Sequence, residues 1–113
     1  MSKTEKNILF ICSRNQWRSP TGEKVWRKEF GLQTRSAGTS PNAKKTISIS
    51  DLQWADVIFV MEKKHKNRIQ ASFSQTIQYK ELVVLDIPDE YKYMDPELVE
   101  IFRALAHEYI QKE

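Results

Sequence analysis

The sequence predicts an α/β protein with three layers, in which a four-stranded parallel sheet carries helices on both faces. Short, continuous apolar runs of the kind that form buried strands alternate with segments of helical periodicity. This alternation is typical of a parallel sheet with right-handed crossovers. The length of 113 residues favours one domain, so residues 1–113 are expected to share a single core.

Four segments are the expected strands, and they differ in character. The first, third and fourth are continuous apolar runs, which indicates burial on both faces. The second is more polar and ends in a glycine-containing turn. The expected strands are residues 7–12, 32–36, 55–61 and 81–87.

Helix start and stop signals separate these strands. Ser19 is a favourable N-cap and Pro20 a favourable first helical residue, so the first helix is expected to begin there and to end at Gly31. A short helix is expected after Ser50, and residues 62–73 form a basic amphipathic pattern.

The last helix is expected to begin at Asp95 and Pro96, which form a second N-cap and first-residue pair. Its apolar residues recur at helical spacing and predict one buried face. These residues are Leu98, Ile101, Phe102, Leu105, Tyr109 and Ile110.

Cys12 and Asp89 are expected at the same edge of the sheet. Cys12 ends the first strand, and Asp89 follows the fourth. Ligands of open parallel sheets bind at the carboxyl ends of the strands, beside a helix N-terminus. The two side chains can therefore face one cleft although they lie far apart in the sequence.

Residues 12–19 form the connection between the first strand and the first helix, and they carry the clearest chemical signal. The N–H groups of such a loop can converge on an anion, and the helix N-terminus adds partial positive charge. This field favours a thiolate at Cys12, while the planar guanidinium of Arg18 suits two phosphate oxygens. Ser19 can donate a hydrogen bond to the sulfur. A simple buried cysteine is the plainer interpretation, but the arginine and the helix start favour a phosphate site with a nucleophile at its floor.

The composition excludes several other kinds of site. Cys12 is the only cysteine, which rules out an internal disulfide and a metal site built from several thiolates. His65 and His107 are far apart, so neither a metal nor another cofactor is expected. The formal net charge of +3 would suit an anionic substrate, although a solvated surface is the simpler explanation of the charge taken by itself.

No membrane or nucleic-acid partner is favoured. No apolar run approaches the roughly 18 residues of a membrane-spanning helix, and the polar N-terminal segment lacks a signal-peptide core. A cytoplasmic protein is therefore expected. The basic cluster in residues 62–73, made of Lys63, Lys64, Lys66 and Arg68, is expected to be a solvated helix face rather than a nucleic-acid patch.

The segment LFICSRNQWRSP, residues 9–20, resembles the signature of the low-molecular-weight protein tyrosine phosphatases. The resemblance continues through residues 36–39 (SAGT), 54–65 (WADVIFVMEKKH) and 85–91 (LDIPDEY), and so covers most of the chain in order. It implies the same four-stranded parallel fold. Thiol-based arsenate reductases share this type of loop but need further cysteines, which this chain lacks.

The resemblance implies a phosphate monoester hydrolase that works in two steps without a metal. Cys12 would attack the phosphorus and form a cysteinyl-phosphate, and Arg18 with the loop amides would stabilise the transferring group. Asn15 would hold the loop conformation. The candidate substrate-binding residues are Ser13, Arg14, Asn15, Gln16, Trp17, Ser19 and Tyr91. The alternatives are a phosphoester-binding module without turnover, or a phosphatase acting on a nucleotide or an RNA end.

The general acid is expected to be Asp89. The resemblance points to it because residues 86–91 match the family's loop after the last strand, with Glu90 in place of a proline. Asp95 is the second candidate, although a helix N-cap explains it well, and Asp86 is the third.

Several positions depart from the family pattern. Trp17 stands where many eukaryotic members have a second cysteine, and it is expected to pack behind the loop rather than to contact substrate. The segment between residues 39 and 54 is shorter than in typical members, which leaves the substrate open. Tyr91 and Tyr93 could wall the pocket or simply pack on the sheet edge. His65 is expected to have a satisfied polar role.

Overall fold

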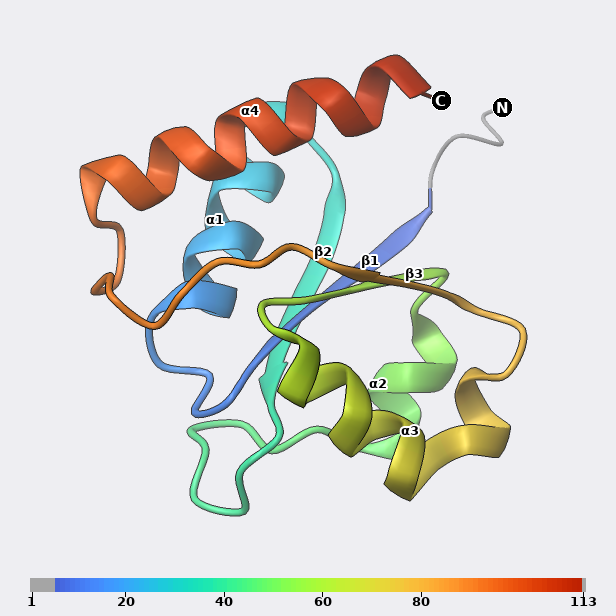
Figure 1. Cartoon of the computed structure of the whole chain (residues 1–113). Coiled ribbons are helices and arrows are strands. Elements are labelled where there is room, and N and C mark those ends of the chain that lie inside the picture. Colours follow the sequence, from blue (N-terminus) through green and yellow to red (C-terminus); the bar gives the residue numbers. More distant parts are fainter. Residues whose placement is uncertain (1–5, 113) are drawn as a thin grey trace.

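The chain folds as a three-layer α/β structure, seen in a computed structural model that describes residues 6–112 (Figure 1). All pairings within the sheet are parallel, and the strand order is β2-β1-β3-β4. The strands are β1 (Asn7–Cys12), β2 (Gln33–Gly38), β3 (Val57–Val60) and β4 (Glu81–Val84). The fold class predicted from the sequence is therefore confirmed.

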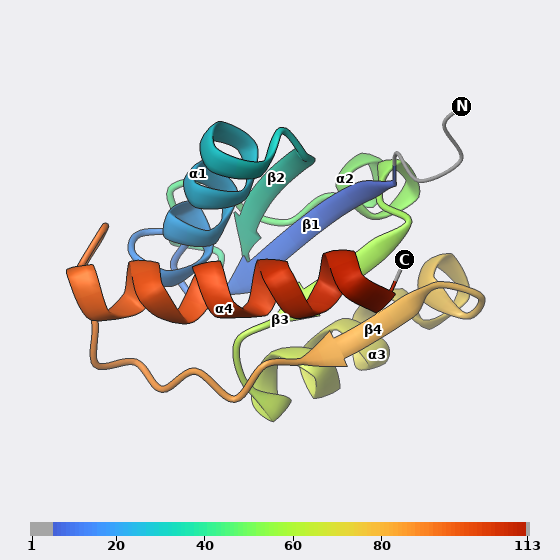
Figure 2. The same ribbon diagram turned by 90° about the horizontal axis from the view of Figure 1, so that it is seen from above.

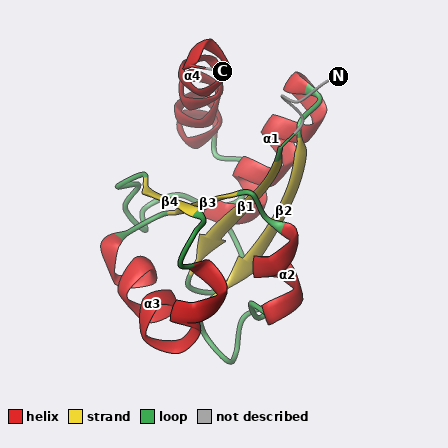
Figure 3. Cartoon of the chain, turned by 90° about the vertical axis from the view of Figure 1, so that its right-hand side faces the viewer, coloured by secondary structure: helices red, strands yellow, loops and turns green. Residues whose placement is uncertain are grey.

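Two helices cover each face of the sheet. The helices are α1 (Arg18–Phe30), α2 (Ile49–Trp54), α3 (Lys63–Ile77) and α4 (Pro96–Lys112). α1 and α4 pack side by side on one face (Figure 2), and α2 and α3 lie on the other (Figure 3). No helix in the described part of the chain is long and apolar enough to span a bilayer.

Strand β1 is the centre of the core because its side chains alternate between two hydrophobic clusters. Phe10 points to the side of α1 and α4, where its ring meets Trp26 edge-on with a centroid distance of 4.9 Å. Leu9 and Ile11 point to the opposite side and pack in the cluster of α2 and α3. Burial on both faces holds the end of β1, and with it Cys12, in one position.

The first two helices begin earlier than the sequence predicts, whereas α1 ends before Gly31 as expected. α1 begins at Arg18 with Trp17 as its N-cap residue, so Ser19 is not the cap. The hydroxyl of Ser19 is instead committed to Cys12 and Asn15. α2 begins at Ile49, because Ser48 accepts a capping hydrogen bond from the Asp51 amide at 3.2 Å.

The later elements also shift. β3 and β4 are shorter than residues 55–61 and 81–87, and β2 extends to Gly38. α3 continues to Ile77 through a non-helical residue, Phe73. Their types and order are as predicted, but β4, which was expected to be buried on both faces, lies at the edge of the sheet and is only partly buried.

The start of α4 is as predicted, but its last turn is not. The Asp95 carboxylate accepts a hydrogen bond from the Glu97 amide at 2.9 Å, as an N-cap residue does. Ile110 was expected on the buried face but is 43% exposed. Because four residues are slightly more than one turn, the row that starts at Leu98 and Phe102 rotates around the helix and leaves the sheet near Ile110.

Candidate active site

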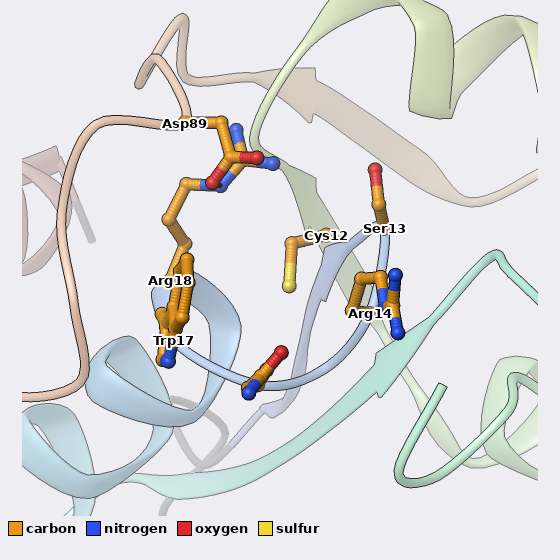
Figure 4. A pocket seen from close by; sticks show the side chains of 7 residues that line it. Cys12, Ser13, Arg14, Trp17, Arg18 and Asp89 are labelled. Carbon is orange, nitrogen blue, oxygen red and sulfur yellow. Dashed lines mark ion pairs between the residues drawn. The ribbon is translucent and has the colours of Figure 1, made fainter. Parts of the chain in front are cut away.

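A pocket lies at the carboxyl ends of the strands, where parallel α/β sheets bind ligands (Figure 4). Four of its lining residues come from the loop between β1 and α1, one ends β1, one begins α1, and the seventh comes from the segment after β4. The lining residues are Cys12, Ser13, Arg14, Gln16, Trp17, Arg18 and Asp89. The structure thus brings together the thiol, the arginine and the aspartate that the sequence singled out.

The loop of residues 12–18 is held in place through its carbonyl groups, which point away from the pocket. Three successive carbonyls accept hydrogen bonds from backbone N–H groups of residues 39–44: Thr39 to Cys12 (3.0 Å), Ser40 to Ser13 (2.9 Å) and Lys44 to Arg14 (3.0 Å). The C=O and N–H of one peptide unit point in opposite directions, so the next amides face the other way. Across residues 6–112, no N–H group of residues 13–18 donates a hydrogen bond. These donors are left for an anion.

Asn15 fixes the turn of the loop. Its φ of 52° is in the left-handed region, which asparagine tolerates better than most residues. The buried side-chain amide donates to Ser19 Oγ at 3.0 Å and to Ser36 Oγ at 2.9 Å, and Ser36 in turn donates to the Glu23 carboxylate. Asn15 therefore holds the loop conformation, as expected, but its side chain lies beneath the pocket and does not line it.

Cys12 forms the floor of the pocket and is 3% exposed. Ser19 Oγ lies 3.0 Å from its sulfur. Since the Asn15 amide already donates to Ser19 Oγ, the hydroxyl proton of Ser19 remains available for the sulfur. Ser19 therefore acts from below, through Cys12, and does not line the pocket.

Arg18 is 2% exposed and is held by three groups. Its Nη1 donates to the carbonyl oxygen of Ile87 at 2.8 Å and to the Glu62 carboxylate, and its Nε lies 3.7 Å from Asp89 Oδ1. Burial alone would raise the pKa of Glu62, but the hydrogen bond and charge of Arg18 bring that pKa below its usual value. The charged Glu62 thus balances the buried guanidinium and fixes its orientation.

Glu62 and Gly38 are site residues that the sequence analysis missed. Glu62 lies two residues after Val60, the last residue of β3, so the strand-end argument that found Asp89 could also have found it. Gly38 ends β2, and a Cβ there would lie 2.6 Å from the carbonyl oxygen of Ser13 and 2.9 Å from the amide nitrogen of Asn15. The loop can pass this closely only because Gly38 has no side chain.

His65 connects α3 to the loop and has the satisfied polar role expected for it. Its Nδ1 accepts a hydrogen bond from the Glu62 amide at 3.0 Å, and its Nε2 lies 2.8 Å from Ser13 Oγ. Burial, reinforced by the positive charge of Arg18, lowers the pKa of His65 to about 4. The imidazole is therefore neutral at pH 7.

The three candidate acids lie in different surroundings. Asp89 lines the pocket, and its side chain is 57% exposed. Asp95 is occupied at the N-terminus of α4. Asp86 is exposed with a φ of 57° and does not line the pocket. The geometry favours Asp89.

The aromatic residues are arranged differently from the expectation. Trp17 lines the pocket and does not pack behind the loop. It is the N-cap residue of α1, which begins at Arg18, and this position leaves its side chain at the pocket rim. Tyr91 does not line the pocket: it packs against the core cluster of α1 and α4, with its hydroxyl 3.4 Å from Glu97 Oε2. Tyr93 is 46% exposed, and Lys24 lies over its ring.

Within residues 6–112, no group of three or more His, Cys, Asp or Glu side chains could hold a metal. In the basic cluster of α3, Lys66 is half-buried and the other three residues are exposed.

No family model and no curated protein matches the sequence. Solved structures do match the fold. The YwlE arginine phosphatase from Geobacillus stearothermophilus is 20% identical, with a TM-score of 0.73, and the match covers 95% of this chain and 94% of that one. The tyrosine phosphatase Wzb from Escherichia coli K30, in complex with phosphate, is 20% identical, with a TM-score of 0.76 and coverages of 96% and 99%.

A third match is SP-PTP, a low-molecular-weight protein tyrosine phosphatase from Streptococcus pyogenes. It is 19% identical, with a TM-score of 0.75, and the match covers 95% of this chain and 92% of that one. The chain therefore has the fold of the low-molecular-weight protein tyrosine phosphatases.

Proposed function

We propose that residues 1–113 form a cysteine-dependent phosphatase that hydrolyses phosphate monoesters through a cysteinyl-phosphate intermediate. The observation that carries this proposal is the loop of residues 12–18, where unengaged amides and a buried guanidinium surround a single thiol. A tetrahedral dianion is the ligand that such a loop suits best.

In the first step, the sulfur of Cys12 attacks the phosphorus of the bound monoester. The S–P bond forms while the bond from phosphorus to the leaving oxygen breaks, and Asp89 gives its proton to that oxygen. Arg18 and the amides of residues 13–18 stabilise the charge on the three phosphoryl oxygens. Glu62 keeps Arg18 in place throughout.

In the second step, a water molecule attacks the phosphorus of the cysteinyl-phosphate. Asp89, now ionised, takes a proton from this water, and the P–S bond breaks to release inorganic phosphate. The electron pair returns to sulfur as a thiolate, which Ser19 stabilises with its hydrogen bond. Together, the two steps return Cys12 to the thiolate and Asp89 to its protonated form.

The proposed acid is Asp89. Its place at the mouth of the pocket, on the same side as Arg18, supports this choice (Figure 4). Asp95 is already used in capping α4, and its replacement is expected to affect stability more than chemistry.

The proposed substrates are phosphotyrosine in proteins or small aryl phosphates, hydrolysed in the cytoplasm. The Trp17 ring at the pocket rim supports an aryl group, since aromatic rings stack favourably on one another. The matched structures include tyrosine phosphatases and an arginine phosphatase, so phosphoarginine belongs in any substrate panel.

The test compares hydrolysis of 4-nitrophenyl phosphate and phenyl phosphate by wild type, Cys12→Ser, Asp89→Asn and Asp95→Asn. Cys12→Ser should abolish turnover. Asp89→Asn should slow phenyl phosphate far more than 4-nitrophenyl phosphate, because only the poor leaving group needs the proton. Asp95→Asn should keep most activity, because its amide oxygen can still cap α4.

Four results would change the conclusion. No turnover together with tight vanadate or phosphate binding would indicate a phosphoester-binding module. Neither turnover nor binding would overturn the phosphate site altogether. Full activity of Asp89→Asn on phenyl phosphate would remove Asp89 as the acid, and hydrolysis of nucleotides or RNA ends alone would replace the proposed substrate.

A further inference from the structure

Ser13 and His65 are joined across the pocket wall. Ser13 follows Cys12 in the loop, and His65 lies in the first turn of α3. The distance from Ser13 Oγ to His65 Nε2 is 2.8 Å, and His65 is 1% exposed. A histidine buried this completely needs a partner for each ring nitrogen, and the two partners determine where its proton is.

The direction of this hydrogen bond follows from the other side of the ring. His65 Nδ1 accepts a hydrogen bond from the Glu62 backbone N–H at 3.0 Å, and a backbone N–H only donates. Nδ1 therefore carries a lone pair, and the single proton of the neutral ring is on Nε2. His65 donates to Ser13 Oγ. The low pKa of His65, caused mainly by burial, agrees with a neutral ring.

The hydroxyl proton of Ser13 is then turned away from His65. Its oxygen accepts from the imidazole, so its O–H needs a different acceptor. Ser13 lines the pocket, on the opposite side from Arg18 and Trp17 (Figure 4). Within residues 6–112, His65 is the only hydrogen-bond partner of the Ser13 side chain.

We propose that the Ser13 hydroxyl donates a hydrogen bond to the transferring phosphoryl group, and that His65 is the positioning residue that turns this hydroxyl into the pocket. The proposal rests on the proposed function. No covalent bond changes at either residue: Ser13 keeps its proton and stabilises the negative oxygen that faces away from Arg18. Preorganised donors of this type act where charge develops, without reorganisation cost.

The two amide replacements of His65 separate its two hydrogen bonds. In His65→Asn the side-chain oxygen can take the place of Nδ1 and accept from Glu62, but no donor reaches Ser13. In His65→Gln the longer amide can place an N–H near the position of Nε2 and donate to Ser13. Ser13→Ala removes the hydroxyl, and Ser13→Thr keeps it. His107→Asn, at an exposed position on α4, is the matched control.

Ser13→Ala is expected to lower kcat/KM for 4-nitrophenyl phosphate by about tenfold, the effect of losing one hydrogen bond to a charged group. The inhibition constant of vanadate should rise by a similar factor. His65→Asn should match Ser13→Ala, and His65→Gln and Ser13→Thr should keep most activity. The double variant Ser13→Ala/His65→Asn should be no slower than Ser13→Ala alone. His107→Asn should equal wild type.

A direct measurement checks the direction of the bond. In a long-range ¹H–¹⁵N spectrum of the full chain at pH 7, His65 should appear as the neutral tautomer with its proton on Nε2. The other tautomer, or a charged ring, would overturn the proposal. So would wild-type activity and vanadate affinity in Ser13→Ala, or equal losses in His65→Asn and His65→Gln that follow only their melting temperatures.

Failure of the proposed function can be told apart from failure of this inference. If wild type shows no turnover but binds phosphate, the affinity for inorganic phosphate replaces kcat/KM as the readout. An undiminished phosphate affinity in Ser13→Ala would then overturn the role of Ser13 alone. If wild type binds neither phosphate nor vanadate, both proposals are overturned.

Discussion

The hydroxyl oxygen of Ser19 lies 3.0 Å from the sulfur of Cys12, and it accepts a hydrogen bond from the Asn15 side chain at the same distance. Because the amide only donates, the Ser19 proton is available to the sulfur, and the other acceptor in reach, the carbonyl oxygen of Ala37, is farther away at 3.5 Å. A thiolate at the floor of the pocket therefore has a neutral donor beneath it, which matters most when that thiolate is the leaving group.

Replacing Ser19 should slow the second chemical step more than the first. In Ser19→Ala the departing thiolate loses its donor, so breakdown of the cysteinyl-phosphate should fall by about tenfold to a hundredfold. Rapid mixing with 4-nitrophenyl phosphate should show a burst of nitrophenol, and intact-mass analysis should show phosphorylated enzyme. Ser74→Ala, on the exposed side of α3, is the control. A steady-state loss with no burst and no phosphoenzyme would contradict this role.

A methyl group at Gly38 should damage the loop. In Gly38→Ala the added Cβ would lie 2.6 Å from the Ser13 carbonyl oxygen, so the loop must move. Both the melting temperature and the affinity for vanadate should fall, with a stability loss of about 1–3 kcal/mol.

Gly22→Ala is the matched control for this prediction. Its Cβ would lie 2.6 Å from the ring of Phe102, in the core between α1 and α4. It should lower the melting temperature similarly but leave the vanadate affinity of the folded protein nearly unchanged. Equal losses of affinity in both variants would mean that general instability, rather than the loop, explains the effect.

His65 should make the folded state sensitive to mild acid. Its pKa falls from 6.5 to about 4 on folding, so below pH 6.5 the unfolded chain binds the proton more tightly. The contribution of neutral His65 to the free energy of unfolding is therefore fully present above pH 6.5. It is lost progressively as the pH falls from 6.5 toward 4. By pH 5 the loss should be about 2 kcal/mol relative to pH 7.

Urea unfolding at pH 7, 6 and 5 measures this dependence. His65→Asn should flatten it, although the variant starts from a lower stability. The groups around the ring are Arg18 and Lys64, which favour the neutral form, and Glu62 and Asp89, which oppose it. An equally steep decline in His65→Asn would assign the acid sensitivity to other groups.

Arg14 should influence which substrates bind well. Its side chain is exposed at the pocket rim, and it contacts no carboxylate within residues 6–112. Arg14→Gln should reduce kcat/KM for 4-carboxyphenyl phosphate by about threefold to tenfold and reduce its salt dependence, with a smaller effect on phenyl phosphate. Arg68→Gln, an exposed charge on α3, should do neither. Identical losses on both substrates would show that Arg14 does not distinguish them.

The nucleophile loop was predictable from the sequence because its determinants are local. An apolar strand ends at Cys12, a helix begins within a few residues, and Arg18 lies at that helix start. The spacing between Cys12 and Arg18 therefore indicates a phosphate site without any information about tertiary contacts. The same is true of Asp95, whose capping role follows from the residues beside it.

The residues that complete the site were decided by tertiary structure. The strand order places β2 and β3 on either side of β1, which brings Gly38 under the loop and Glu62 beside Arg18. Tyr91 and Trp17 were misjudged for the same reason, since the side of the pocket that a loop residue faces depends on the elements packed around it.

The sequence by itself determined the reactive groups and the type of fold, because hydrophobic periodicity, helix signals and the Cys-to-Arg spacing act over a few residues. Only the tertiary structure decided how these groups are oriented and which groups neutralise or hydrogen-bond them. The direction of the Ser13–His65 hydrogen bond, the partner of the buried Arg18 and the room for the loop over Gly38 all depend on backbone and side-chain groups from different strands and helices. Such contacts exist only once the chain has packed.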